Sequence, residues 1–243
     1  MKYLLNSLRI VILLAFTLLT SCENYDSLSL FDGKLLEGWE GPDSIFRVED
    51  GCIVGGSMDK PLDRSYYLCT INTYDNFELI LKAKFKNKGT YENAGISFRA
   101  ERVPNSTQVA GYQADMGYIE PDIIPIFSDF SPSDMNSPYP LWGILVDEHR
   151  SNTSRYPNKD FAPVVFLDIP DRSLIENIIK EDNWNDLRII ANGPKIKILI
   201  NGISTVNYLE KEKWIPREGH ICLQAHSGGP YEILYKDIRL KKL

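Results

Sequence analysis

The sequence predicts an all-β fold, a sandwich of two antiparallel sheets. Short runs that alternate apolar with polar residues recur along the chain, and turn residues separate them at close intervals. Helical periodicity is nearly absent. The roughly 220 residues that follow the N-terminal leader suit one such domain, because sandwiches and barrels of this length fold as single units.

Strands are expected, in order, at 46–56, 66–74, 77–86, 94–101, 111–118, 142–147, 186–193, 195–202, 219–226 and 231–243. The run FELILKAKFK is the clearest. Its apolar residues Phe77, Leu79 and Leu81 alternate with Glu78, Ile80 and Lys82, which predicts one buried and one wetter face. Asn192-Gly193 and Asn201-Gly202 predict type I′ hairpins, which need positive φ at two adjacent positions.

Three further segments complete the sandwich domain. RSLIENIIK at 172–180 is the run with helix-compatible spacing. Residues 119–141 are rich in proline and aspartate, and 151–171 form a second irregular run. Long loops of this kind are often binding loops or lids, so we expect 119–141 to form a lid or an extra wall of a site.

Residues 1–22 read as a bacterial lipoprotein signal peptide. A short basic segment precedes an apolar run that is too short to span a bilayer, and Leu19-Thr20-Ser21-Cys22 resembles a lipobox. We therefore expect lipidation at Cys22, a tether at 23–30 and a single sandwich domain at 31–243. The protein would be an exported lipoprotein, periplasmic or anchored at the outer membrane or cell surface. The alternative is an ordinary signal with a chance cysteine.

Charge and cysteine content narrow the function classes. The formal net charge is −6, and loss of the leader with Lys2 and Arg9 would make it more negative. Such a surface repels phosphate backbones, which argues against nucleic acid. Cys52, Cys69 and Cys222 would allow one disulfide and one free thiol, but their apolar neighbours favour three buried thiols and no disulfide.

Polar residues recur at period two inside otherwise apolar strands. Gln113 and Asp115 share one strand face in GYQADMG, and Gln224 and His226 share one in LQAH. Arg99 in GISFRAE would join them if the three strands are neighbours. One face would then form a sugar-sized cleft, because sugars are bound by amide, carboxylate and guanidinium groups beside an aromatic ring. The plainer alternatives are a solvent-facing polar row and a strand-end histidine satisfied by a loop carbonyl.

Ordered blocks across the chain give a more specific result. FDGKLLEGWEG, NAGISFRAE, GYQADMG, WGILVDEHR and GHICLQAHSGG occur in this order. From about residue 29 to 243 the chain resembles the DUF1080 family, also named the 3-keto-disaccharide hydrolase domain. The resemblance implies a concanavalin A-like jelly-roll β-sandwich and cleavage of glycosides whose sugar carries a ketone at C3. That ketone acidifies the C2 proton, so a base can remove it, the C1 substituent can leave, and water then adds.

The matching blocks supply the candidate site. Our hypothesis for their roles is that His226 is a base or metal ligand and that Glu148 and Asp115 are acids or metal ligands. The substrate-binding residues implied are Arg99, Gln113, Trp142, Arg150 and Gln224. His149 is expected to be variable and solvent-facing.

Several alternatives stay open at the level of sequence. The partner expected is a carbohydrate, with membrane contact through the lipid anchor only. No cofactor is certain, although a divalent metal ion such as calcium would also explain the carboxylates. The same fold could serve as a non-catalytic carbohydrate-binding module or a structural surface lipoprotein.

Overall fold

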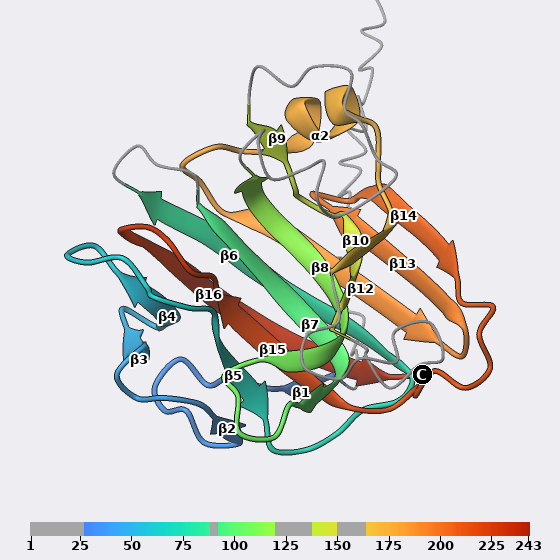
Figure 1. Ribbon diagram of the computed structural model, residues 1–243, viewed down its shortest axis with the longest axis horizontal. Coiled ribbons are helices and arrows are strands. Elements are labelled where there is room, and N and C mark those ends of the chain that lie inside the picture. The colour runs from blue at the N-terminus through green and yellow to red at the C-terminus, as the bar shows by residue number, and fades with distance from the viewer. Residues whose placement is uncertain (1–26, 88–91, 120–137, 150–163) are drawn as a thin grey trace, which may run out of the picture.

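The protein is a sandwich of two antiparallel β-sheets, as the sequence predicts (Figure 1). The computed structural model describes residues 27–87, 92–119, 138–149 and 164–243. Within these ranges the two sheets, called sheet A and sheet B below, each contain eight strands. The short helix α2 and strand β9 lie together at one end of the sandwich (Figure 1).

Sheet A has the strand order β14 (Ile203–Leu209), β13 (Lys195–Ile200), β12 (Asn185–Asn192), β6 (Phe77–Asn87), β16 (Tyr231–Lys242), β4 (Cys52–Ser57) and β3 (Phe46–Glu49), with β1 (Leu28–Ser29) paired to β16. Sheet B has the order β11 (Val165–Asp168), β10 (Leu145–Glu148), β8 (Val109–Ile119), β7 (Asn93–Arg102), β15 (His220–Ala225), β5 (Tyr66–Thr70) and β2 (Trp39–Glu40), with β9 (Tyr139–Pro140) paired to β8. Helix α2 covers Arg172–Ile178.

The core lies between the two sheets. The predicted inner row of β6 is confirmed, since Phe77, Leu79 and Leu81 are fully buried. Phe98 of β7 meets Phe77 edge-on, with ring centroids 6.2 Å apart. The alternation of β6 therefore fixes which face of sheet A is turned toward sheet B.

The turns and the helix follow the sequence with small shifts. Asn201 and Gly202 both have positive φ, at 50° and 83°, as the predicted type I′ hairpin requires. In the other hairpin Asn192 pairs with Lys195, so the two-residue loop is Gly193-Pro194, one residue later than predicted. Helix α2 begins as expected, because the Asp171 side chain accepts bonds from the first backbone N–H groups.

The boundary of the predicted tether is wrong. Leu28 and Ser29 pair with β16, and the N–H of Leu30 donates to Ile238, so residues 28–30 belong to sheet A. The signal peptide and the lipidation site Cys22 lie outside the described residues. Among those that are described, no helix is long and apolar enough to cross a membrane.

Five strands were not predicted. Three of them, β1, β2 and β9, have two residues each. Of the other two, β14 directly follows the Asn201-Gly202 turn, and β11 lies within the run at 151–171 that was expected to be irregular. These two are outermost strands, one at the edge of each sheet. Sequence patterning is weak there, because an edge strand is less buried than a central one.

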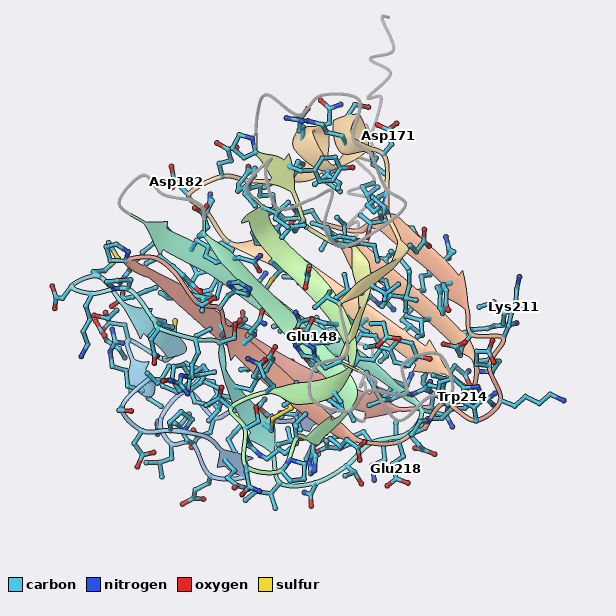
Figure 2. The ribbon with its side chains drawn as sticks, viewed as in Figure 1. Glu148, Asp171, Asp182, Lys211, Trp214 and Glu218 are labelled. Carbon is cyan, nitrogen blue, oxygen red and sulfur yellow. A yellow bond between two sulfur atoms is a disulfide. The ribbon has the colours of Figure 1, made fainter. Side chains whose placement is uncertain are left out.

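The prediction of three free thiols is also wrong. Cys69 and Cys222 form a disulfide, and Cys52 is the free cysteine of the described chain. The two bonded cysteines stand directly opposite each other on β5 and β15, with Cα atoms 3.9 Å apart. Their apolar sequence neighbours Leu68 and Leu223 point the other way, into the core. Figure 2 draws the bond in yellow.

Candidate functional site

A set of polar side chains lies on the face of sheet B that is turned away from sheet A, called the outer face below. On β8, Ala114 and Met116 join the core between the sheets, so the alternating Gln113 and Asp115 point outward. Strands β8, β7 and β15 are neighbours, as the sequence analysis required. Gln224 of β15 therefore faces outward beside them.

These side chains form one hydrogen-bonded group, the polar network, whose six members are Tyr67, Ser97, Gln113, Asp115, Glu148 and Gln224. None of the six is more than 7% exposed. Buried polar groups are costly unless they are hydrogen-bonded, so the network must be internally satisfied to persist. It joins five strands, from β5 to β10.

The hydrogen bonds of the network have fixed directions. Ser97 donates to Gln113 Oε1 at 2.6 Å, so the amide nitrogen of Gln113 faces Asp115 Oδ1 at 2.8 Å and Gln224 Oε1 at 3.4 Å. Gln224 Nε2 then donates to the Tyr67 hydroxyl at 2.6 Å. The Tyr67 hydroxyl in turn donates to Glu148 Oε1 at 3.3 Å.

Because amide nitrogens only donate and carboxylate oxygens accept, every bond in this chain leads toward a carboxyl group. The two ends are Asp115 and Glu148. The network therefore holds two carboxyl groups in set positions.

Gly95 makes room for the network. It stands opposite Asp115 on β7, and a Cβ placed there would lie 2.4 Å from Cδ of Gln113. No real Cβ contact is that short, so the amide of Gln113 crosses the space that a larger residue would fill. The glycine in GISFRAE is thus required for Gln113 to reach both Asp115 and Gln224.

The two carboxyl groups differ in their surroundings. Burial raises the pKa of both, and the pKa of Asp115 lies well above its ordinary value, with the charge of Glu148 raising it further. The pKa of Glu148 is also raised, but His149 and the Tyr67 hydroxyl oppose the rise. Glu148 therefore ionises first, and its charge keeps Asp115 protonated. Burial also raises the pKa of Tyr67, so its hydroxyl stays a donor.

His226 follows the last residue of β15 and is partly buried. Its Nδ1 lies 2.9 Å from the carbonyl oxygen of Ser227, which can only accept, so Nδ1 carries the proton. Burial lowers the pKa of His226, which leaves Nε2 as the unprotonated nitrogen of a neutral ring. No hydrogen bond between described residues joins this ring to the polar network. The sequence analysis had expected the imidazole and the acids to meet.

His149 lies close to the network, contrary to the prediction that it faces solvent. Its side chain is 14% exposed, and its Nε2 is 3.4 Å from Glu148 Oε1. The backbone of His149 has a φ of 53°, in the left-handed region, directly after β10 ends. This turn of the chain brings the imidazole back toward Glu148.

The sequence predicted that Arg99 would join the polar side chains of the outer face, and this prediction is wrong. Its guanidinium donates to the backbone carbonyls of Asp75 and Gly193 at 2.8–2.9 Å. The cause is a β-bulge, because the pairing of β7 with β8 shifts after Phe98 and Arg99 has a φ of 48°. The extra residue breaks the alternation on which the prediction depended, and Arg99 instead ties sheet B to the β12–β13 turn.

Trp142 is not a substrate-binding ring in this structure. It is 3% exposed and packs edge-on against Phe85 of sheet A, with centroids 5.8 Å apart. Strand β10 begins at Leu145, so Trp142 lies in the preceding turn and points into the core. Arg150, the other predicted sugar contact in this block, lies outside the described residues.

Tyr67 was missed by sequence reasoning. In YYLCT it has no polar neighbour at period two, so it reads as a core aromatic. One feature could have indicated its position. Tyr67 and Cys69 are two residues apart and share a strand face, and the disulfide from Cys69 to Cys222 places that face beside Gln224.

The sequence left a divalent metal ion open as an alternative. Within the described part of the chain no three His, Cys, Asp or Glu side chains are grouped closely enough to hold a metal ion. Asp115 and Glu148 accept hydrogen bonds from Gln113 and Tyr67.

Comparison with known proteins identifies the family. A model of the 3-keto-alpha-glucoside-1,2-lyase-like domain matches residues 26–241. The chain belongs to this family, whose name refers to the chemistry of oxidised glucosides. No curated protein matches the chain in sequence.

Solved structures of low sequence identity share the fold. A candidate glycosyl hydrolase from Parabacteroides distasonis is 18% identical, with 89% of this chain and 94% of that chain covered and a TM-score of 0.56. The carbohydrate-binding module CBM66 from Bacillus subtilis is 10% identical, with 84% and 96% covered and a TM-score of 0.56. At these identities the two structures show only that they share a β-sandwich fold with this chain, and a fold by itself does not define an activity.

Proposed function

We propose that the protein cleaves glycosides of 3-keto sugars by elimination across C1 and C2. The observation that carries this proposal is the polar network, in which hydrogen bonds hold two buried carboxyl groups, those of Asp115 and Glu148, in set positions. A family model for a 3-keto-alpha-glucoside-1,2-lyase-like domain over residues 26–241 supports the substrate class. The disulfide supports the predicted export, because disulfides persist in oxidising compartments.

The reaction needs one base and one acid. The C3 ketone makes the C2 proton acidic, and the base removes it. The electron pair of the C2–H bond becomes the C1–C2 double bond, while the bond between C1 and the glycosidic oxygen breaks. The acid gives that oxygen a proton, so an alcohol leaves and an unsaturated 3-keto sugar remains. Water can then add across the double bond.

Glu148 is assigned as the base and Asp115 as the acid. The charge of His149 and the hydrogen bond from Tyr67 favour the ionised form of Glu148, whereas burial and the charge of Glu148 favour the protonated form of Asp115. Pairs of carboxyl groups held in opposite protonation states are typical of acid–base sites. His226 is the other candidate base, since its ring is neutral and Nε2 can accept a proton.

Burial has a consequence for substrate entry. The six side chains of the network are almost fully buried. The atoms that bury them must therefore move apart before a sugar can contact Glu148 and Asp115. Once the sugar is bound, exclusion of water strengthens the electrostatic effect of each charge.

The test uses a 3-keto-glucoside with a chromophoric leaving group. We expect the wild-type protein to release the alcohol, with a primary isotope effect when C2 carries deuterium, and to leave the ordinary glucoside intact. Glu148→Gln and Asp115→Asn should each lower kcat by roughly 10²–10⁴-fold while circular dichroism stays unchanged. His226→Ala distinguishes the two candidate bases.

Full activity in both carboxyl variants would refute the assignment of roles. Binding of the keto sugar without release would indicate a carbohydrate-binding module instead. A parallel assay with a chelator tests whether a divalent metal ion is needed, since activity would then disappear with the chelator and return with calcium.

A further inference from the structure

The face of sheet A that is turned away from sheet B carries an excess of basic side chains. On β6 the residues Phe77, Leu79 and Leu81 point into the core, so the residues that alternate with them point the other way. The outward residues of β16 stand beside them in register, because the residues between them belong to the core. This surface is called the basic face below, and its central members are Lys82, Lys84, Lys86, Lys236, Arg239 and Lys241. The acidic side chains among them are Glu78, Glu232 and, in the bulge of β16, Asp237.

The basic excess continues on two neighbouring strands. Arg188 of β12 and Lys195 and Lys197 of β13 lie on the same face, because the residues that alternate with them are buried in the core. Asp186 is the acidic side chain on this face of β12. Over the four strands, nine basic side chains therefore stand against four acidic ones.

Two plainer roles for these lysines do not fit their position. Lysine on an outermost strand often protects the edge of a sheet, but β6 and β16 lie in the middle of sheet A (Figure 1). Surface charge also keeps a protein soluble through its net charge, yet the chain has a formal net charge of −6, which these lysines reduce. Positive charge is thus gathered on one face, and the excess of acid lies elsewhere in the chain.

Most acidic side chains of the basic face are held in ion pairs. These pairs are Glu232 with Arg47 and Lys86, Asp186 with Lys82, and Glu78 with Arg188. Lys84 and Arg239 form no ion pair with another described residue. Lys82 and Lys236 stand directly opposite each other, and like charges in that register repel. A negatively charged partner would relieve this repulsion, so the basic face is complementary to an anionic surface.

The chain enters the sandwich on this same sheet. Leu28 and Ser29 of β1 pair with β16, and Ser29 stands opposite Arg239. The predicted lipidation site Cys22 precedes Leu28 by six residues, which reach about 22 Å at most when fully extended. An acyl anchor at Cys22 would therefore keep sheet A close to the bilayer, where charges act over a Debye length of about 8–10 Å.

We propose that the basic face docks on the anionic headgroups of a phospholipid bilayer. Lipid phosphates supply the negative charge that complements this face, and they attract each lysine and arginine that comes near the surface. The sequence analysis expected membrane contact through the lipid anchor only, because net charge does not reveal how charge is distributed over the faces.

Docking also sets the orientation of the molecule. The polar network lies on the outer face of sheet B, on the side of the sandwich opposite to the basic face. Contact between the basic face and the bilayer thus turns Glu148 and Asp115 away from the membrane, toward the solvent from which a glycoside arrives. This inference goes beyond the proposed function, and its test does not depend on activity.

The test measures binding to vesicles by sedimentation. It uses residues 23–243 without a lipid, since every strand lies within this range and binding then reports the protein surface alone. We expect the wild-type protein to bind vesicles of phosphatidylethanolamine with phosphatidylglycerol and not vesicles of phosphatidylcholine. Sodium chloride raised from about 0.05 M to about 0.5 M should release it, because salt screens exposed charges.

Charge reversal locates the binding surface. Lys84→Glu combined with Arg239→Glu reverses two charges of the basic face and breaks no ion pair between described residues. Lys34→Glu combined with Lys60→Glu is the matched control, with the same change in net charge on exposed loops that join the two sheets. The first pair should weaken binding to the anionic vesicles by about tenfold or more, and the control by less than about twofold. Circular dichroism checks that both variants fold.

Four outcomes would overturn the proposal. The wild-type protein could fail to bind anionic vesicles at low salt, or bind them equally well at high salt. The two variant pairs could weaken binding equally, which would mean that net charge alone governs it. Retention on an immobilised acidic polysaccharide without binding to vesicles would assign the basic face to a soluble polyanion instead. The salt and lipid comparisons need only the wild-type protein, so they decide the question even if a variant misfolds.

Discussion

The phenol oxygen of Tyr67 on β5 lies 3.3 Å from Oε1 of Glu148 on β10. In sheet B three strands, β15, β7 and β8, separate these two. Four steps of about 4.8 Å would place β5 and β10 roughly 19 Å apart in a flat sheet, which is more than two side chains and a hydrogen bond span. Sheet B must therefore curve toward its outer face, and the polar network lies in the hollow.

Replacing Tyr67 with Phe should shift the pH dependence of activity. The Tyr67 hydroxyl lowers the pKa of Glu148 by donating to its carboxylate, so its removal raises that pKa. A reaction that needs ionised Glu148 then loses activity at a higher pH. We expect the acidic limb of a kcat/KM profile to move to higher pH, with a loss of about 1–3 kcal/mol in stability from the unpaired Gln224 amide.

Tyr118→Phe is the matched control, because Tyr118 donates to the carboxylate of Glu181 at 2.8 Å outside the network. Its pH profile should equal that of the wild type. An unshifted acidic limb in Tyr67→Phe would show that Glu148 is not the group that must be ionised.

Gly95→Ala should disrupt the network while leaving the fold intact. The new Cβ would meet Cγ, Cδ and Nε2 of Gln113, so this amide must leave Asp115 and Gln224. We expect a large loss of activity and a stability loss of about 1–3 kcal/mol by urea unfolding.

A double-mutant cycle tests the cause of that stability loss. In a Gln113→Ala background the clashing atoms are gone, so Gly95→Ala should cost much less. Equal costs in both backgrounds would mean that the glycine is needed for another reason.

The fold was accessible from sequence because its strands alternate in clear runs. Phe77, Leu79 and Leu81 define the buried face of β6 without reference to any other strand. The short edge strands carry no such pattern. The disulfide could not be derived, since whether Cys69 and Cys222 stand opposite each other depends on the pairing of strands 153 residues apart.

The site was predictable only where regular alternation holds. Gln113, Asp115 and Gln224 lie on strands without a bulge between them, where side chains alternate regularly between the two faces. The sequence therefore placed these three on one face. Arg99 breaks this rule because a bulge precedes it, and Trp142 because it lies in a turn before β10. Tyr67 joins the network through curvature of sheet B, which no local pattern encodes.

The disulfide should make a large contribution to stability. In the chain-entropy model a bond that closes a loop of this length contributes up to about 5 kcal/mol, and losses of about 2–5 kcal/mol are typical. Thermal unfolding of the Cys69→Ala, Cys222→Ala double variant should show a lower Tm. Reductant should lower the wild-type Tm toward that of the variant and leave the variant unchanged.

Cys52→Ala is the control for thiol loss, since Cys52 is buried and unbonded. It should keep the sensitivity of the wild type to reductant. A wild-type Tm that does not respond to reductant under denaturing incubation would argue against the bond in the mature protein.

Asp115→Asn should lower the activity and raise the free energy of unfolding. Burial, and then the charge of Glu148, raises the pKa of Asp115 above its unfolded value of about 3.9. The folded state thus binds more protons than the unfolded state between these two pKa values. This contribution to stability is fully present below about pH 3.9 and is lost as pH rises through the folded pKa.

An asparagine does not ionise, so it loses no stability as pH rises, and its side-chain oxygen can still accept a hydrogen bond from Gln113. The variant should therefore exceed the wild type in free energy of unfolding at pH 7.5, with a smaller difference at pH 4.5. Urea unfolding at both pH values measures the free energy of unfolding, and an assay on the 3-keto-glucoside measures the loss of activity. A difference that does not grow with pH would mean that Asp115 titrates normally, and it would then be too acidic to serve as the proton donor.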